Sequence, residues 1–221
     1  MERTIRIKGT GKASVKPDRI VCSIKLSGLD SDYEKAVKRS ADESEQVRES
    51  IASAGLDLKD LKTSSFDVDT EYSYCKDKKR GTETKVLEGY RYRHFMSIEF
   101  PNDNKILGKV LFVLSHCPAE LVFSISYTVS DTESVKNRLL EKATADSRRK
   151  AEILAGAAGV KLGQILQIDY SWGEMQISAE LGGMQNYAKS VCVGDGYDID
   201  FNADDIDVED TVTIVWEIES L

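Results

Sequence analysis

A short acidic segment near the C-terminus has the residue types and the spacing of a calcium-binding loop. Oxygen-bearing side chains occupy positions 1, 3, 5, 7 and 12 of this loop, and they are Asp198, Asp200, Asn202, Asp204 and Glu209. Carboxylate and amide oxygens at these positions are the ligands that Ca²⁺ takes in EF-hand loops. The loop is atypical, because Ala203 replaces the glycine of position six and amphipathic helices do not flank the segment. The alternative interpretation is an acidic loop that leads into the last strand.

The two histidines offer little further chemistry. His94 lies on the apolar face of an expected strand, which is typical of a core or interface histidine. His116 directly precedes Cys117, but the side chains of adjacent residues usually point in different directions. We therefore do not expect the two to form a nucleophile pair. Zinc-ligand spacings and GxSxG, Walker and HExxH motifs are absent from the sequence. We therefore expect a non-enzymatic protein without a cofactor.

The cysteines are scattered along the chain without a CxxC pair, at Cys22, Cys75, Cys117 and Cys192. This pattern predicts reduced thiols, with disulfide bonds as the alternative. A thiol-based redox function stays open at Cys75 and Cys117, which lie near expected loops. Cationic neighbours favour a reactive thiolate, and Lys76, Lys78 and Lys79 could provide them for Cys75.

The composition excludes two classes of protein. The net charge of −8 and the isoelectric point near 5.0 argue against a nucleic-acid-binding protein, which would normally carry a basic patch. No apolar run approaches the roughly 20 residues that span a bilayer, so we expect no membrane span. Without an apolar leader after Met1, the sequence as written predicts a cytoplasmic protein. The alternative is the periplasm or the cell envelope, if the sequence is a processed form.

The longest predicted helix runs from Ser130 to about Gly159. Ser130 and Glu133 have the spacing of a capping box, and glycine is the usual residue just after a helix. One stripe of this helix is small and apolar, with Val135, Leu139, Ala143, Ser147, Leu154 and Ala158, flanked by Ile153 and Ala157. The opposite face alternates acidic and basic residues, as solvated faces do. The run 155–159 has almost no side-chain bulk, which predicts close packing on a sheet.

The remaining periodicity predicts an α+β fold in a single domain, 1–221. A second helix runs from a Ser31–Glu34 capping box to Gly55, and a short third helix ends near 114. Apolar alternation predicts strands at 4–8, 20–26, 66–74, 90–100, 121–129, 166–170 and 212–218. The order ββαββαβαββ indicates an antiparallel or mixed sheet with helices packed on one face. The β-α-β-β order occurs twice, which suggests two halves, although no residue-level repeat accompanies it.

Three segments have no assigned role in this scheme. Gly9-Thr10-Gly11 follows the first strand but lacks the third glycine of a dinucleotide fingerprint, so we expect a bend or bulge. The strands 66–74 and 90–100 form a long hairpin rich in tyrosine, which suits a subunit contact as well as a core. The segment 172–205 shows no sustained period, and a loop this long is often functional. It is our candidate for a ligand-binding module.

Two signatures resemble those of the SIMPL domain family. The first is Gly9-Thr10-Gly11 with Val15-Lys16-Pro17-Asp18, and the second runs from Ala143 through Asp146 and Lys150 to Gly163. The resemblance implies an α+β fold and, in bacterial members, an exported or envelope-associated protein. It also implies ring-shaped homo-oligomers in some members, and oxidative-stress tolerance or signalling through a protein partner in others. The family brings no catalytic residues, so the resemblance predicts a homo-oligomer and not an enzyme.

Overall fold

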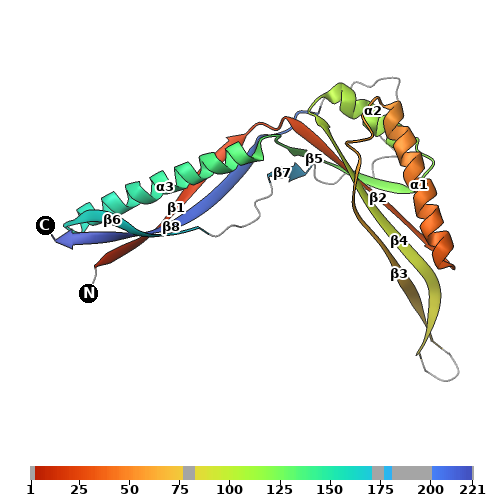
Figure 1. Cartoon of the computed structure of the whole chain (residues 1–221), viewed down its shortest axis with the longest axis horizontal. Coiled ribbons are helices and arrows are strands. Elements are labelled where there is room, and N and C mark those ends of the chain that lie inside the picture. The colour runs from red at the N-terminus through yellow and green to blue at the C-terminus, as the bar shows by residue number, and fades with distance from the viewer. Residues whose placement is uncertain (1–2, 77–82, 171–176, 181–200, 221) are drawn as a thin grey trace. The chain divides into compact units, whose positions relative to one another are not determined.

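The computed structural model describes all residues except 1–2, 77–82, 171–176, 181–200 and 221 (Figure 1). Its elements follow the expected order, with one additional short strand, β7 (Ser178–Glu180), inside the long segment 172–205. Helices and antiparallel strands confirm the α+β class. The fold forms two sheets instead of the expected single one, and the chain divides into two compact units. Unit 1 contains 1–17, 128–179 and 203–221, and unit 2 contains 18–127 and 180–202. The assignment of 1–221 to one domain stays a prediction.

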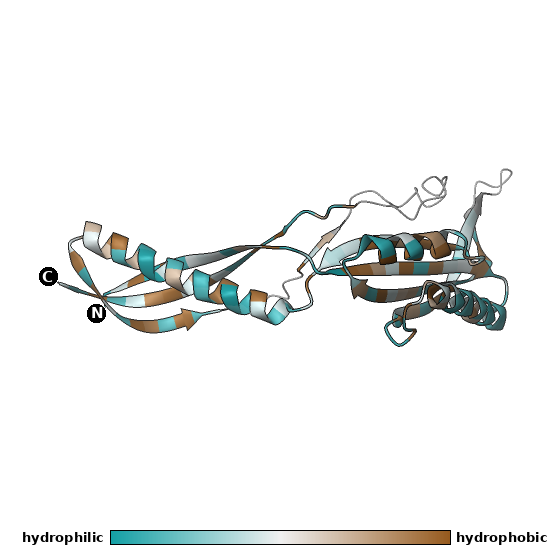
Figure 2. Cartoon of the chain, turned by 90° about the horizontal axis from the view of Figure 1, so that it is seen from above, coloured by the Kyte–Doolittle hydropathy of each residue, from teal (hydrophilic) through white to brown (hydrophobic). Residues whose placement is uncertain are grey.

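Unit 1 is a three-stranded antiparallel sheet with one long helix across it. The strand order is β1 (Thr4–Val15), β8 (Ile206–Ser220) and β6 (Val160–Asp169), and α3 (Thr132–Ala157) covers one face (Figure 1). The pairing of Gly9 with Val212 and of Ala13 with Val208 turns alternate residues of β1 and β8 toward the helix. Around α3 apolar and hydrophilic positions alternate (Figure 2), as expected of a helix with one buried face.

Gly9 and Gly11 lie within β1 and allow the backbone of α3 to approach the strand. A Cβ atom on Gly9 would lie 2.0 Å from the carbonyl oxygen of Ala143, and one on Gly11 would lie 2.0 Å from that of Leu139. The expected bend at these glycines was therefore wrong, and β1 continues through them to Val15. The close approach occurs at the middle of α3, since a Cβ on Gly156 would meet open space. The close packing of helix and strand therefore depends on Gly9 and Gly11 of β1, and not on the small residues at the end of α3.

Each of the two long helices begins one residue later than the sequence predicts. Asp131 caps α3 by accepting a hydrogen bond from the Ser134 amide at 2.9 Å, and Asp32 caps α1 in the same way. The predicted capping boxes that start at Ser130 and Ser31 were therefore wrong. Their Asp neighbours offer a carboxylate to the same helix dipole, and this explains the shift. Glycine after the helix end is confirmed, because Gly55 and Gly159 have φ values of 84° and 67°.

The buried stripe of α3 also differs near its C-terminal end. Burial recurs every four residues, at Val135, Leu139, Ala143, Ser147, Ala151 and Ala155. Each step of four turns the buried direction by about 40°, which lets the helix follow the twist of the strands. Leu154 and Ile153, expected in or beside the core, are instead 49% and 64% exposed.

Unit 2 contains the β3–β4 hairpin and two helices. The five-stranded sheet of the chain has the order β3 (Lys62–Lys76), β4 (Glu83–Pro101), β2 (Arg19–Asp30), β5 (Leu121–Thr128) and β7. The helices are α1 (Tyr33–Ser53), which packs on β2 and β4, and α2 (Asn104–Ser115), which packs on α1. Alternate residues of the two central strands form the core, including Ile20, Ile24, Leu26, Tyr92, Met96 and Phe100. The predicted hairpin is confirmed, although both strands are longer than expected.

Candidate functional site

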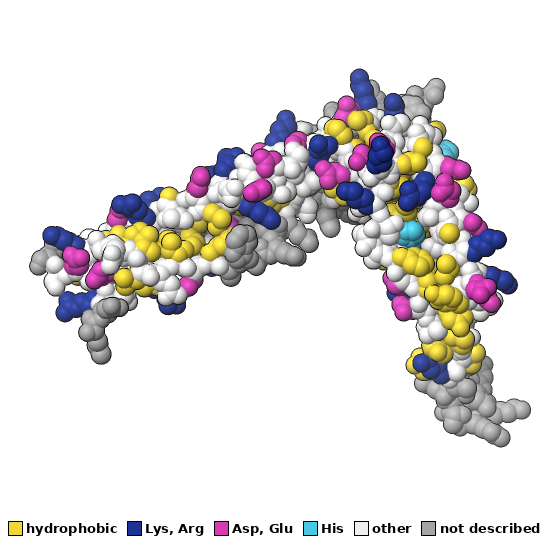
Figure 3. Space-filling model, in the orientation of Figure 1, with side chains coloured by type: hydrophobic (Ala, Val, Ile, Leu, Met, Phe, Trp, Pro, Cys, Tyr) yellow, Lys and Arg dark blue, Asp and Glu magenta, His cyan; other side chains and the backbone are white. Residues whose placement is uncertain are grey.

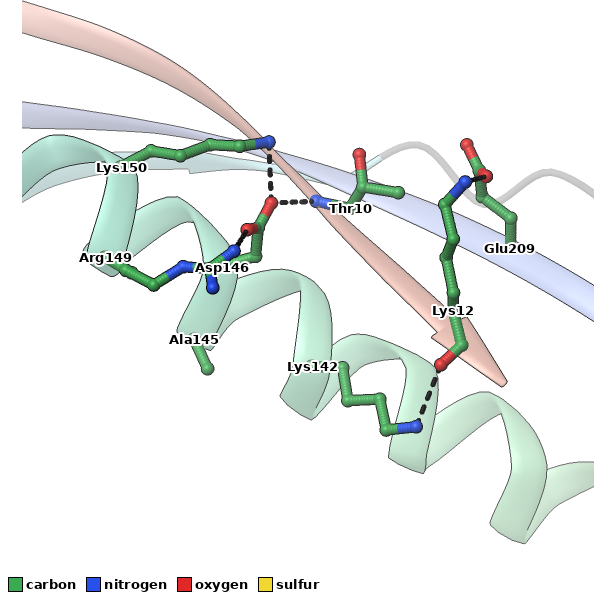
Figure 4. Close-up of a pocket in the computed structure, with 8 residues that line it drawn as sticks. All are labelled: Thr10, Lys12, Lys142, Ala145, Asp146, Arg149, Lys150 and Glu209. Carbon is green, nitrogen blue, oxygen red and sulfur yellow. Dashed lines mark hydrogen bonds and ion pairs between the residues drawn. The ribbon is translucent and has the colours of Figure 1, made fainter. Parts of the chain in front are cut away.

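Polar side chains of α3 follow the free edge of β1 in unit 1. Lys142 Nζ donates to the Lys12 carbonyl oxygen at 2.8 Å, and Lys150 Nζ donates to the Lys8 carbonyl oxygen at 3.2 Å. Between them, the Thr10 amide donates to Asp146 Oδ2 at 3.0 Å (Figure 4). The side chains and backbone groups stay in step because four residues of a helix advance about 6 Å along its axis and two residues of a strand advance about 6.6 Å. An edge strand that would otherwise expose backbone groups is thus satisfied by the helix.

Asp146 is the centre of this row. Its carboxylate accepts from Lys150 Nζ at 2.6 Å and from the Arg149 guanidinium at 2.6 Å, in addition to the Thr10 amide. The hydrogen bond from Lys150, followed by those from Thr10 and Arg149, holds the pKa of this carboxyl well below its usual range. Asp146 therefore stays ionised and engaged, so it is a positioning group and not an acid or base for catalysis.

A cavity of about 710 Å³ opens beside this row (Figure 4). Lys12 borders it and forms an ion pair with Glu209 at 2.9 Å, which raises the pKa of Lys12 and lowers the pKa of Glu209. Both carboxylates of the lining, Asp146 and Glu209, are thus paired with cations. Four cations line the same space, namely Lys12, Lys142, Arg149 and Lys150. With four cations against two carboxylates, the lining can bind an anion.

Of the five residues of the predicted calcium loop, three lie in the described part of the chain and two lie outside it. Glu209 lies within β8 and pairs with Lys12. Asn202 and Asp204 are exposed in the segment before β8, while Asp198 and Asp200 lie outside the described residues. Among the residues that the structure describes, no group of three or more His, Cys, Asp and Glu side chains could hold a metal ion.

Calcium binding stays a prediction of the full five-residue loop. Titration calorimetry of the chain with calcium chloride tests it, with Asp204→Asn as the matched variant. A real site gives heat that the variant loses, and an absence of heat at millimolar calcium removes the hypothesis.

Both histidines make hydrogen bonds. His94 Nδ1 lies 3.3 Å from the Ser40 hydroxyl and its Nε2 lies 3.0 Å from the Thr63 hydroxyl. Burial, with a smaller effect of Arg48, lowers the pKa of His94. His116 Nδ1 lies 2.9 Å from the Phe112 carbonyl oxygen at the end of α2. These contacts fit structural histidines, as expected for His94.

The described cysteine thiols show no activated group. Cys22 and Cys117 are free, and burial in the unit 2 core raises the pKa of Cys22 to about 12. A thiol with such a pKa is inert at neutral pH. Cys117 is half-buried. The Cys75 side chain and Cys192 lie outside the described part of the chain, so the thiol hypothesis at Cys75 stays untested.

A buried polar cluster in unit 2 escaped the sequence analysis. The Tyr92 hydroxyl donates to Glu43 Oε2 at 2.5 Å, and Arg39 donates to the other oxygen of Glu43 at 2.9 Å. Glu43 is only 7% exposed, and Gly28 leaves room for the Tyr92 ring. The signal was available, because Glu43 has helical spacing from the buried Ser40 and Val47. A charge on an apolar stripe indicates a buried partner.

The distal half of the β3–β4 hairpin exposes large apolar side chains. Tyr72, Tyr74, Val86 and Leu87 are 41%, 67%, 45% and 46% exposed. The ammonium of Lys85 lies 3.8 Å from the centre of the Tyr72 ring. Tyr72 pairs with Leu87 and Tyr74 pairs with Lys85, so these four side chains share one face of the hairpin, and we call them the hairpin patch. Val86 lies on the other face. β3 is also the edge strand of its sheet, so its outer backbone groups lack a strand partner in the described structure.

Cross-strand ion pairs accompany the patch nearer the helices. Arg91 of β4 pairs with Glu71 of β3, and Arg93 lies 2.8 Å from Asp67 and 2.9 Å from Asp69. Because opposite charges alternate across the two strands, these pairs support the register of the hairpin. Arg91 and Arg93 are thus paired with carboxylates, whereas the apolar side chains of the hairpin patch are exposed.

Comparison with known proteins gives distant bacterial relatives. Two of them are proteins named 26 kDa periplasmic immunogenic protein, from Brucella abortus (strain S19) and Brucella melitensis biotype 1. Each is 26% identical over 168 residues, which cover 74% of this chain. The chain spans 65% of the length of these curated relatives.

The structure gives the residues of both signatures a packing role. Gly9 and Gly11 admit the backbone of α3, and Asp146 and Lys150 satisfy the edge of β1. The SIMPL model, described as a protein of unknown function (DUF541), matches residues 5–216. The match extends over nearly the whole described chain and includes both units. This chain therefore belongs to the SIMPL family.

Proposed function

We propose that this chain is a non-enzymatic, self-assembling protein of the bacterial envelope, and that copies associate through the hairpin patch. The observation that carries the proposal is the exposure of Tyr72, Tyr74 and Leu87 on one face of the β3–β4 hairpin. Clustered aromatic and aliphatic side chains on a surface mark interaction sites. Figure 3 shows the apolar side chains gathered along the β3–β4 hairpin.

The patch has the chemistry of a contact between proteins. Tyrosine supplies a large apolar surface and a hydroxyl group at low entropic cost, and interfaces are enriched in it. An uncovered edge strand such as β3 adds main-chain donors and acceptors for a second copy. A self-complementary patch of this kind suits the two-fold contact that most homo-oligomers use.

The non-enzymatic part of the proposal is supported by the state of the polar groups. In the described residues, the carboxylates of Asp146, Glu209 and Glu43 are engaged by cations or a tyrosine. The thiol of Cys22 is buried. None of these groups has the pairing of nucleophile and base that catalysis requires.

The envelope placement rests on the relatives, whose names place them in the periplasm. The cytoplasmic expectation gains no support from them. No helix of the described structure is long and apolar enough to cross a membrane. Fractionation of the native host followed by immunoblotting tests the placement, and a purely cytoplasmic signal contradicts it.

Sedimentation velocity on the full chain tests the use of the hairpin patch. The double variant Tyr74→Ser/Leu87→Ser removes two exposed side chains and should shift the chain toward the monomer. Leu58→Ser is the matched control, because Leu58 is 37% exposed in a turn of the same unit. Equal sedimentation of both variants and the unmodified chain places the contact elsewhere.

A further inference from the structure

A second cavity continues the one beside Asp146 along the edge of β1 in unit 1. It measures about 410 Å³ and is lined by Arg6, Ile7, Lys8, Ile153 and Leu154. Lys150 lines both cavities, so the two adjoin along β1 and α3. We call the two together the β1–α3 groove, and its two ends differ in chemistry.

The first end is cationic. Four cations line it, namely Lys12, Lys142, Arg149 and Lys150, against the two carboxylates of Asp146 and Glu209, so two positive charges remain in excess after the ion pairs. Over the whole groove, six cations stand against two carboxylates. This excess of positive charge lies on a chain whose net charge is −8. The cationic end therefore favours the anionic group of a ligand.

The other end adds exposed aliphatic side chains to the cations Arg6, Lys8 and Lys150. Ile153 is 64% exposed and Leu154 is 49% exposed, although the helix pattern assigned both to the core or its border. Leu154 follows Lys142, Asp146 and Lys150 at the same spacing of four, so it extends their row to the level of Arg6 in β1. The row from Lys142 to Leu154 is about 18 Å long. An inorganic anion gains nothing from contact with these aliphatic side chains, whereas an alkyl chain can bury apolar surface against them.

We propose that the β1–α3 groove binds a single anionic amphiphile, with a phosphate or carboxylate head and an aliphatic chain. Lys12, Lys142 and Arg149 hold the head, and the chain lies over Ile7, Ile153 and Leu154. A single molecule is the occupant because the groove follows one strand edge and combines both chemistries along its length. The groove belongs to unit 1 and the hairpin patch to unit 2, so either proposal can fail without the other.

Calorimetric titration of the full chain tests the groove. The probe is dodecyl phosphate below its micellar concentration, compared with sodium phosphate, dodecyl maltoside and vesicles of phosphatidylglycerol. We expect dodecyl phosphate to bind at least tenfold more tightly than phosphate or dodecyl maltoside. Equal binding of phosphate or of dodecyl maltoside overturns the proposal. Binding to vesicles without binding to monomeric dodecyl phosphate also overturns it, because it identifies a membrane surface instead.

Paired variants locate the site. Lys142→Gln/Arg149→Gln should weaken dodecyl phosphate binding roughly 10- to 30-fold and flatten its dependence on salt. Ile153→Ser/Leu154→Ser should also weaken it, without changing the salt dependence. Arg138→Gln and Ile168→Ser are the matched controls, since both side chains are exposed in unit 1 outside the groove. Thermal melts verify folding, and unchanged affinity in both double variants contradicts the proposal.

Discussion

Asp146 shows how one side chain can join a helix to a strand edge. Its carboxylate accepts hydrogen bonds from the Thr10 amide, Lys150 and Arg149 at the same time. Each of these groups favours the ionised form, so the folded state binds this proton less tightly than the unfolded chain does. Stability and pH are therefore linked through Asp146.

The sign of this linkage gives a prediction for Asp146→Asn. The folded pKa lies below the ordinary value of 3.8, so the stabilisation is present above pH 4 and is lost as the pH falls below it. The variant should melt at a lower temperature than the unmodified chain at pH 7, and the difference should shrink below about pH 4. Thermal melts followed by circular dichroism measure this. Asp60→Asn, at an exposed turn, is the control. A difference that is constant from pH 7 to pH 3 contradicts the role of Asp146.

Tyr92 and Glu43 are the corresponding buried pair of unit 2. Tyr92→Phe removes the hydroxyl that donates to Glu43 and leaves the carboxylate short of one buried donor. We expect a loss of about 1–3 kcal/mol in the free energy of unfolding, measured by urea titration. Tyr74→Phe should change it by less than about 0.5 kcal/mol, because Tyr74 is 67% exposed. Equal effects of the two substitutions show that the Glu43 contact contributes little.

At the scale of elements, the glycines of β1 and of α3 should respond in opposite directions to alanine. Gly11→Ala places a Cβ atom 2.0 Å from the Leu139 carbonyl oxygen, so α3 must move. Overpacking of this kind costs about 1–3 kcal/mol. Gly156→Ala meets open space within the helix and should stabilise the fold by about 0.5–1 kcal/mol. Urea unfolding compares the two variants, and a neutral Gly11→Ala refutes the close approach of α3 to β1.

Local signals in the sequence predicted most elements but not their partners. The alternation of Ile20, Ile24 and Leu26, and the glycine at the end of each long helix, depend on nearby residues only. The pairing of Thr4 with Glu217 joins the two ends of the chain and has no local signature, so the expected single sheet became two. Leu154 was misplaced for the same reason, because the twist of the sheet below α3 decides which helix positions are buried.

The candidate sites were harder to predict than the fold. The tyrosines of the hairpin were visible in the sequence, but their exposure depends on how far α1 covers β3 and β4. The β1–α3 groove joins Lys12 to Lys142, which are remote in sequence and meet only through the pairing of helix and strand edge. The acidic segment, by contrast, had a clear spacing, yet Glu209 proved to be a strand residue paired with Lys12.

For the whole molecule, the residues that carry the resemblance to the SIMPL family have a structural task. Gly9 and Gly11 admit the backbone of α3, and Asp146 binds the edge of β1. Two surfaces of the described residues expose apolar side chains for the partner and the ligand of our proposals, the hairpin patch of unit 2 and the groove of unit 1. Association of copies through the patch is the central claim.

Light scattering coupled to size exclusion tests that claim most directly. Each copy has a mass of 24.6 kDa, so assembly predicts a dominant species at an integral multiple of this mass that persists as the sample is concentrated. The Tyr74→Ser/Leu87→Ser variant should elute nearer the single-copy mass under the same conditions. A mass of 24.6 kDa for the unmodified chain at every concentration would contradict the account.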